Sequence, residues 1–166
     1  LTTMRDDELE AGLARAFAGD YRVDELPTLE VSLDGGTYTA VNDAVVAGGT
    51  LGRMVRLEWA VGDEVLGVQP CDGLICATPP GSTAYNLSNG GPVLVWGLEA
   101  MVLTFVAPHA LVIRPLVVPR GTDVRIRNET DDVEAAVLVD GHQIGTLASG
   151  EEVLVRVGEQ HCVLAT

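Results

Sequence analysis

The sequence predicts a mainly β fold, a layered antiparallel β-sandwich. Short apolar segments recur at spacings of roughly 8–12 residues, a pattern typical of sandwiches. Turn signals separate several of them, among them Asp34-Gly35-Gly36 and Asp140-Gly141. Hydrophobic residues make up 47% of the 166-residue chain but aromatic residues only 4%, so the core must consist of Val, Leu, Ile and Ala. A chain of this length suits one domain with a substantial core.

Two short helices are the expected exceptions to the β pattern. Residues 3–18 predict an amphipathic helix that Thr3 caps and that Gly19 ends, with the acidic residues 6–8 in its first turn. A second short helix is expected near residues 82–88. The apolar face of the first helix would comprise Leu9, Leu13, Ala16 and Phe17.

The strands follow from alternation and from β-branched runs. Residues 29–33 alternate, the Asp34-Gly35-Gly36 turn follows, and residues 37–46 return, which predicts a hairpin. The other candidates, in chain order, are Val55–Trp59, Val65–Val68, Leu74–Ala77, Val102–Val106, Arg114–Val118, Val124–Arg127, Ala136–Val139, Val153–Val157 and Cys162–Ala165.

Charge excludes several classes of partner. The formal net charge is −14, and all ten basic residues are Arg. Such a surface repels nucleic-acid phosphates and anionic lipids, so we expect neither as a partner. No apolar run approaches the ~20 residues that span a bilayer, and no signal-peptide pattern opens the sequence, so we expect a cytoplasmic protein. Cys71, Cys76 and Cys162 lack zinc-site spacing and are expected to be reduced thiols, with no metal site in this chain.

The segment CDGLICATPPGSTAYNLSNGGP, residues 71–92, is the most informative in the chain. Pro79, Pro80 and Gly81 fix a tight backbone path. The hydroxyl-bearing residues and free N–H groups that follow lie at a predicted helix start. This combination favours binding of a polar, partly anionic small molecule over filling of a core.

Three further positions are candidate ligand contacts, each with a structural alternative. Asn42 and Asp43 break an apolar strand, so they mark either a β-bulge or edge, or polar side chains aimed at a ligand. Asp72 precedes Gly73 and heads an apolar strand, where it either forms a turn or contacts a ligand. Arg53 follows a glycine-rich loop that lacks the Lys of a phosphate-binding loop, and it is either a solvated residue or a cation near Asn42 and Asp43.

Together these segments resemble the carboxy-terminal domain of NAD kinases. The Thr-Pro-x-Gly-Ser-Thr-Ala-Tyr motif is highly specific, and the Pro-His-x-Leu-x-x-Arg-Pro-Leu segment is a second, independent match. Their order and spacing match from about Leu1 to Gly145. The resemblance implies a β-rich sandwich that holds the dinucleotide. By resemblance the contact residues are Asn42, Asp43, Arg53, Asp72, Thr83, Ala84, Tyr85, Asn86, Leu87, Ser88 and Ala107.

The sequence also departs from the family pattern. Pro80 stands where relatives usually carry Thr or Ser, and Asp43 replaces the commoner Glu, which shortens its reach by one methylene. The Gly-Gly-Asp-Gly motif, whose Asp is thought to be the catalytic base, is missing and would precede Leu1. We therefore expect residues 1–20 to be an interdomain helix, residues 21–166 to be the dinucleotide-binding domain, and the segment alone to be inactive.

The resemblance implies an enzyme that phosphorylates the adenosine ribose 2′-hydroxyl of NAD to give NADP. The donor would be ATP or polyphosphate with a divalent metal such as Mg²⁺, and the assembly a homodimer or homotetramer. Two alternatives remain at this point. One is a lipid kinase of the same superfamily, which the absence of a basic face disfavours. The other is a non-catalytic β-sandwich interaction module.

Overall fold

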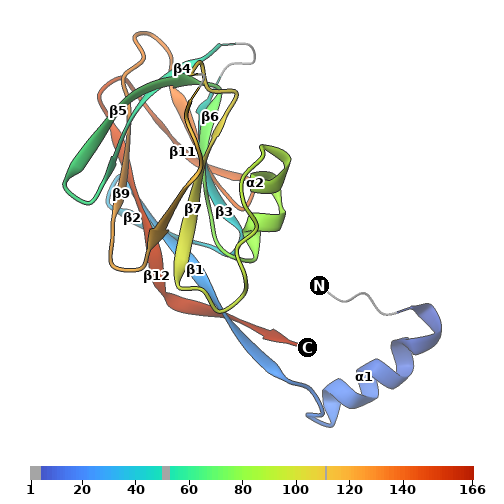
Figure 1. The fold of residues 1–166 in the computed structure, drawn as a ribbon. Coiled ribbons are helices and arrows are strands. Elements are labelled where there is room, and N and C mark those ends of the chain that lie inside the picture. The colour runs from blue at the N-terminus through green and yellow to red at the C-terminus, as the bar shows by residue number, and fades with distance from the viewer. Residues whose placement is uncertain (1–4, 50–52, 111) are drawn as a thin grey trace.

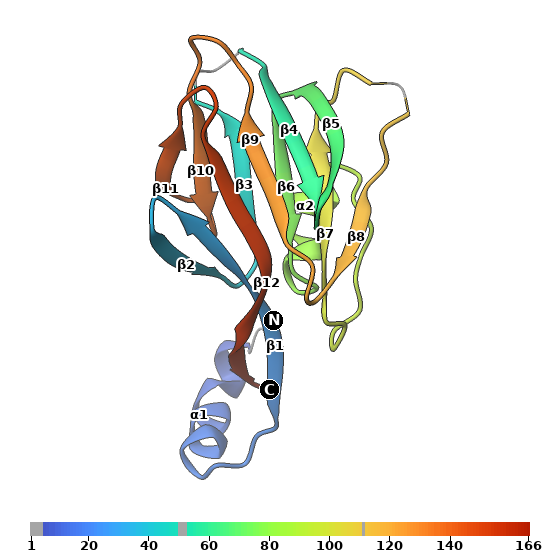
Figure 2. The same cartoon turned by 90° about the vertical axis from the view of Figure 1, so that its left-hand side faces the viewer.

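Two antiparallel sheets packed face to face form the body of the chain (Figures 1 and 2). The computed structural model describes residues 5–49, 53–110 and 112–166. Within these residues each sheet has six strands, which confirms the predicted sandwich. The first sheet runs, in spatial order, β2 (Gly36–Ala40), β1 (Val23–Leu33), β12 (Glu152–Ala165), β9 (Val124–Asn128), β4 (Val55–Val61) and β5 (Glu64–Cys71). The second runs β11 (His142–Leu147), β10 (Ala135–Val139), β3 (Asp43–Gly48), β6 (Gly73–Ala77), β7 (Ala100–Val106) and β8 (Leu116–Pro119).

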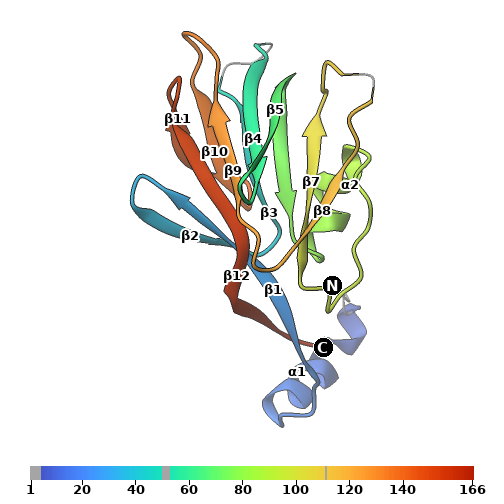
Figure 3. The ribbon, with the colours of Figure 1, turned by 60° about the vertical axis from the view of Figure 1, so that its left-hand side comes forward.

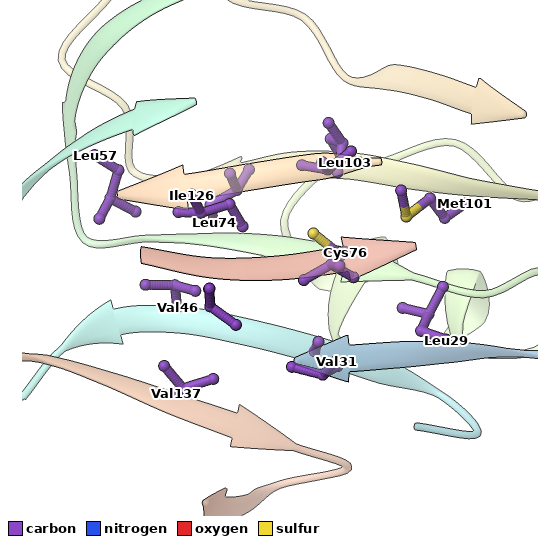
Figure 4. Close-up of a cluster of buried hydrophobic side chains, with 14 of the residues drawn as sticks. Leu29, Val31, Val46, Leu57, Leu74, Cys76, Met101, Leu103, Ile126 and Val137 are labelled. Carbon is purple, nitrogen blue, oxygen red and sulfur yellow. The ribbon is translucent and has the colours of Figure 1, made fainter. Parts of the chain in front are cut away.

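The main core lies between the two sheets and is aliphatic, as the composition predicts. Strands β9 and β10 each alternate buried and half-buried residues, so one face of each strand enters the core. Figure 4 shows side chains from both sheets meeting there, for example Leu29 and Ile126 from the first sheet and Leu74 and Leu103 from the second. The few aromatic residues contribute one edge-to-face contact, with the rings of Trp59 and Phe105 5.3 Å apart.

Strand β6 is buried along its whole length because both of its faces are covered. One face points into the main core, while Ile75 and Ala77 point the other way, into a smaller apolar cluster with Val102 and Leu94. Leu94 belongs to the segment after α2 (Tyr85–Ser88), so this segment acts as a lid on the outer face of the second sheet. Double coverage explains why the sequence of β6 is a continuous apolar run without alternation.

The amino-terminal helix differs from its prediction. A 3-10 turn at Asp6–Glu8 leads into α1 (Leu9–Phe17), and the predicted cap Thr3 lies outside the described residues. None of the residues of α1 is buried, and the Phe17 side chain is 88% exposed. Figure 3 shows why: α1 lies away from the sandwich, beyond the two-stranded ribbon in which Val23 of β1 pairs with Ala165 of β12.

Three strand predictions need correction. The predicted return strand 37–46 is two strands in different sheets, β2 and β3, because the chain breaks between Ala40 and Asp43 and crosses from one layer to the other. The two candidates 153–157 and 162–165 form one continuous strand, β12. Strand β11 was not predicted, because its glycine and polar residues give no apolar alternation. No helix among the described residues is long and apolar enough to cross a membrane.

Candidate functional site

A pocket of about 410 Å³ opens on the outer face of the second sheet, beside α2. Its volume falls in the range of roughly 300–1,000 Å³ that is typical of small-molecule sites. A second, smaller hollow of about 180 Å³ lies on the first sheet, where Arg127 and Glu152 neutralise each other in an ion pair. The larger pocket is lined by Asn42, Asp43, Val45, Ala47, Ala84, Tyr85, Leu138, Asp140 and Gly141.

The crossing between the two sheets forms one wall of this pocket. Asn42 lies in the turn between β2 and β3, and Asp43 begins β3 in regular pairing, so neither residue is at a β-bulge. Asp43, the first residue of β3, pairs with Ala77 at the end of β6. The strand ends therefore place both polar side chains at the rim of the sheet, next to the chain that follows β6.

The Thr-Pro-Pro-Gly turn brings the opposite wall into place. The Thr78 hydroxyl donates hydrogen bonds to the carbonyl oxygens of Val41 (2.7 Å) and Asn42 (3.1 Å) and accepts one from the Gly81 N–H (3.0 Å). A Cβ atom at Gly81 would lie 1.9 Å from the Asn42 carbonyl oxygen, so only glycine fits there. This close approach makes the loop and the Asn42 turn one rigid unit.

Asn86 fastens α2 to the sheet and does not line the pocket. Its side-chain amide is fully buried and donates hydrogen bonds to the carbonyls of Ser82 (2.8 Å) and Pro92 (3.0 Å). Its side-chain oxygen accepts one from the Thr104 hydroxyl (2.6 Å). The amide and the oxygen of this side chain are thus both engaged within the protein, so its predicted contact with a ligand stays a prediction. Tyr85, the residue before it, is held with its side chain half exposed at the pocket.

The electrostatics of the pocket are acidic. Burial raises the pKa of the Asp43 carboxyl, and the neighbouring Asp140 charge raises it further. Among the described residues that line this pocket there is no Arg or His. Carboxylate and amide oxygens accept hydrogen bonds, so the pocket suits hydroxyl and amine donors and disfavours a phosphate group.

The structure brings together only four of the predicted contact residues. Asn42, Asp43, Ala84 and Tyr85 line the pocket. The other predicted members of the Thr83–Ser88 run lie on or beside α2 without lining it: Thr83, Leu87 and Ser88 are exposed and Asn86 is buried.

Three predicted contact residues lie at the opposite end of the sheet. The Asp72 N–H donates to the Val106 carbonyl (2.9 Å), and the Asp72 carbonyl accepts from Gly48 (3.1 Å), which places Asp72 beside Ala107. Arg53 lies there too, since a Cβ atom at Gly48 would lie 2.5 Å from its carbonyl oxygen. Asp72 is five residues from the pocket end of β6, about 16 Å at 3.3 Å per residue. All three are exposed, and Ala107 has a φ of +44°, which is unusual for a residue other than glycine.

Sequence reasoning missed part of the pocket. Asp140 and Gly141 were predicted only as a turn, Leu138 and Val45 only as strand residues, and Ala47 lay just outside the predicted strand 37–46. Their contribution depends on the pairing of β10 with β3, about ninety residues apart in sequence, which no local pattern reveals. An Asp-Gly pair that follows an apolar strand was the one available signal.

Comparisons with known proteins identify this architecture. A family model described as "ATP-NAD kinase C-terminal domain" matches residues 41–166. An NAD kinase of Heliobacterium modesticaldum is 44% identical over 99% of this chain and 60% of that relative, and one of Gemmatimonas aurantiaca is 40% identical over 93% and 55%. The chain thus spans little more than half the length of these curated relatives.

Solved structures agree. A yeast NADH kinase complexed with NADH superposes with a TM-score of 0.88 at 25% identity, over the whole of this chain and 50% of that one. An NAD kinase from Archaeoglobus fulgidus in complex with ATP gives a TM-score of 0.84 at 26% identity, over the whole of this chain and 64% of that one. The chain therefore belongs to the ATP-NAD kinase C-terminal domain family.

Proposed function

We propose that this chain is the dinucleotide-binding part of an NAD kinase, which transfers a phosphoryl group to the 2′-hydroxyl of the adenosine ribose of NAD. One observation carries the proposal. Two segments some forty residues apart, Asn42-Asp43 and Ala84-Tyr85, meet around a single pocket of suitable size. The relatives named NAD kinase and the NADH-bound yeast structure support the same ligand class.

The pocket residues have distinct proposed roles. Asn42 and Asp43 accept hydrogen bonds from ribose hydroxyls and from amine or amide groups of the dinucleotide, and Tyr85 packs its ring on a ligand ring with Ala84 beneath. Thr83 and Ser88, exposed beside the pocket, offer further hydroxyl donors. Each neutral hydrogen bond contributes about 1 kcal/mol net, so several must act together. Leu87 and Asn86 are proposed to act through the placement of α2.

The group at the opposite end of the sheet requires a second copy of the chain. Asp72, Ala107 and Arg53 cannot reach the pocket of their own chain, because the length of β6 separates them from it. A homodimer or homotetramer places one chain's far end beside its neighbour's pocket, which gives these residues their proposed contact with the dinucleotide. The exposed Ala107 with its positive φ fits such a role, because strained residues cluster at binding sites.

The chemical step is proposed to depend on residues outside this chain. Removal of the 2′-hydroxyl proton requires a base, proposed to be the Asp of the Gly-Gly-Asp-Gly motif, which this sequence lacks. The donor is ATP or polyphosphate, and a divalent metal such as Mg²⁺ accompanies it. Among the described residues there is no group of three or more His, Cys, Asp or Glu side chains that could hold a metal ion. We therefore propose that the 166-residue chain alone is inactive as a kinase. We also propose that the working enzyme is cytoplasmic.

Calorimetric titration of the chain with NAD and NADP tests the proposal. We expect NAD to bind, and Tyr85→Ala to weaken binding on the order of tenfold, since stacking on an aromatic ring is worth about 1–3 kcal/mol. Tyr38→Ala is the matched control, because Tyr38 is a similarly exposed tyrosine on β2, outside the pocket. Equal affinities of the two variants, or no binding of either dinucleotide, would contradict the proposal. NADP formation by the chain alone above background would contradict its predicted inactivity.

A further inference from the structure

The backbone N–H and C=O groups of Val41 and Asn42 form their hydrogen bonds with residues outside the turn. The Asp140 carboxylate accepts the N–H of Val41 (2.8 Å) and of Asn42 (2.7 Å), and also that of Asp43 (3.1 Å). From the other side, Thr78 supplies the donors for the two carbonyl oxygens: the single proton of its hydroxyl is shared between that of Val41 (2.7 Å) and that of Asn42 (3.1 Å), and its backbone N–H donates to that of Asn42 (2.9 Å). Every backbone polar group of these two residues is thus bonded to Asp140 or Thr78.

The two partners come from different parts of the chain. Asp140 follows β10 and is anchored to the start of β3, because its own N–H donates to the Asp43 carbonyl (2.9 Å). Thr78 follows β6 and is fully buried. A carboxylate that accepts three N–H bonds forms stronger, charge-assisted bonds than a neutral acceptor does. The turn is therefore held from both sides of β3, by the residues that follow its two flanking strands, β10 and β6.

We propose that Asp140 and Thr78 are positioning residues of the pocket: together they clamp the Val41–Asn42 turn and so aim the side chains of Asn42 and Asp43 at the ligand. The proposal rests on the proposed function for the identity of that ligand. Neither residue needs to touch the dinucleotide. Because the clamp occupies the N–H groups of Asn42 and Asp43, these two residues face the ligand with their side chains and not with backbone donors.

Substitutions at Asp140 can remove its hydrogen bonds to the Val41–Asn42 turn without straining the Asp140-Gly141 turn. Its φ of +46° suits glycine and asparagine, so Asp140→Gly removes all three hydrogen bonds while relieving the backbone. Asp140→Asn keeps one acceptor oxygen but turns an NH₂ group toward N–H donors. At Thr78, Thr78→Val removes the hydroxyl at nearly constant volume, and Thr78→Ser keeps it.

The test combines amide NMR with NAD titration of the 166-residue chain. We expect the amide protons of Val41, Asn42 and Asp43 to shift upfield in Asp140→Gly, and the NAD dissociation constant to rise on the order of tenfold or more. Asp140→Asn and Thr78→Val should fall between this variant and the wild type. Thr78→Ser should restore wild-type affinity, which a purely volume-filling role of Thr78 would not predict.

Asp34→Gly is the matched control. Asp34 also has a positive φ (+52°) and precedes a glycine in a hairpin turn, but its carboxylate has no hydrogen bond within the described residues. We expect its NAD affinity and the three amide signals to be unchanged. Wild-type amide signals or wild-type NAD affinity in Asp140→Gly would overturn the clamp. Absence of NAD binding by the wild-type chain would overturn the ligand assignment instead, while the amide signals would still decide whether Asp140 fixes the turn.

Discussion

An aspartate lies at each end of strand β6, but one lines a pocket and the other is exposed to solvent. At one end Ala77 pairs with Asp43, and the chain that follows folds back over the sheet to enclose a pocket. At the other end Gly73 pairs with Ala47 and Val106, and Asp72 points its carboxylate into solvent. The first end is clamped by hydrogen bonds from the residues that follow β10 and β6, the two strands that flank β3, whereas the second end lines neither of the two pockets described above.

This difference indicates which part of the proposed dinucleotide site a single chain can form by itself. The pocket end has a floor from β3 and β10, a wall from the Asn42 turn and a rim from Tyr85. The far end has exposed polar side chains and Ala107 at a φ of +44°, and none of the described residues there lines either of the two pockets. In our proposal one end supplies a finished half-site and the other supplies contacts to a neighbour, so the two ends should respond differently to substitution.

Adding one methyl group at each end gives the largest expected contrast. In Gly81→Ala the new Cβ would lie 1.9 Å from the Asn42 carbonyl oxygen, so the loop must move away from the turn. We expect the free energy of unfolding to fall by about 3 kcal/mol or more, and NAD binding to be lost. In Gly73→Ala the nearest atom, the Val46 carbonyl oxygen, lies at 2.7 Å, so we expect a smaller loss of about 1–2 kcal/mol. Urea denaturation measures both. Equal losses would show that the two ends are equally tightly packed.

Mixing two variants tests whether the ends of different chains meet. Tyr85→Ala removes a proposed ligand contact at the pocket end, and Asp72→Ala removes one at the far end. We expect each variant alone to weaken NAD binding on the order of tenfold. If a site combines one chain's pocket with its neighbour's far end, then mixed oligomers contain some sites in which both ends are wild type. Titration of the mixture should therefore show a fraction of sites with wild-type affinity.

The control for this experiment is dilution. Below the dissociation concentration of the oligomer the recovered sites should vanish, and Asp72→Ala should bind NAD as well as the wild-type monomer does. Recovery that survives dilution, or an Asp72→Ala variant that is normal at every concentration, would contradict a shared site.

The fold was predictable because its determinants are local. Apolar alternation located most strands, and the Asp34-Gly35 pair marked a real turn, with both residues at positive φ. The errors occur where the chain changes layer. Residues 37–46 look continuous in sequence, yet the polar Asn42 and Asp43 mark the crossing from one sheet to the other.

The site was predictable only in part, because hydrogen-bonding partners far apart in sequence decide which side chains remain available. Asn86 belongs to the specific motif, but Thr104 and the carbonyls of Ser82 and Pro92 engage its amide. Asp140 looked like an ordinary turn residue, and its three bonds to the Asn42 turn follow from the pairing of β10 with β3. Separating the two ends of β6 likewise required the register of the sheet.

The smallest expected effect concerns the charge at each end. Burial raises the pKa of the Asp43 carboxyl, so the folded chain holds this proton more tightly than the unfolded chain does. Its contribution to stability is therefore fully present below the ordinary value of 3.8 and is lost as the pH rises through the folded-state pKa. Asp43→Asn should raise the denaturation midpoint at pH 7, and the gain should shrink to nothing as the pH falls below 3.8.

At the far end Asp72→Asn removes a carboxylate that is exposed to solvent, so we expect its denaturation midpoint to match that of the wild type at both pH values. Asp43→Asn should at the same time weaken NAD binding, because the variant loses a charged acceptor inside the pocket. Opposite changes in stability and affinity at Asp43 would mark a carboxylate retained for its ligand at a cost to the fold. A variant less stable than the wild type at pH 7 would show instead that the ionised carboxylate stabilises the turn.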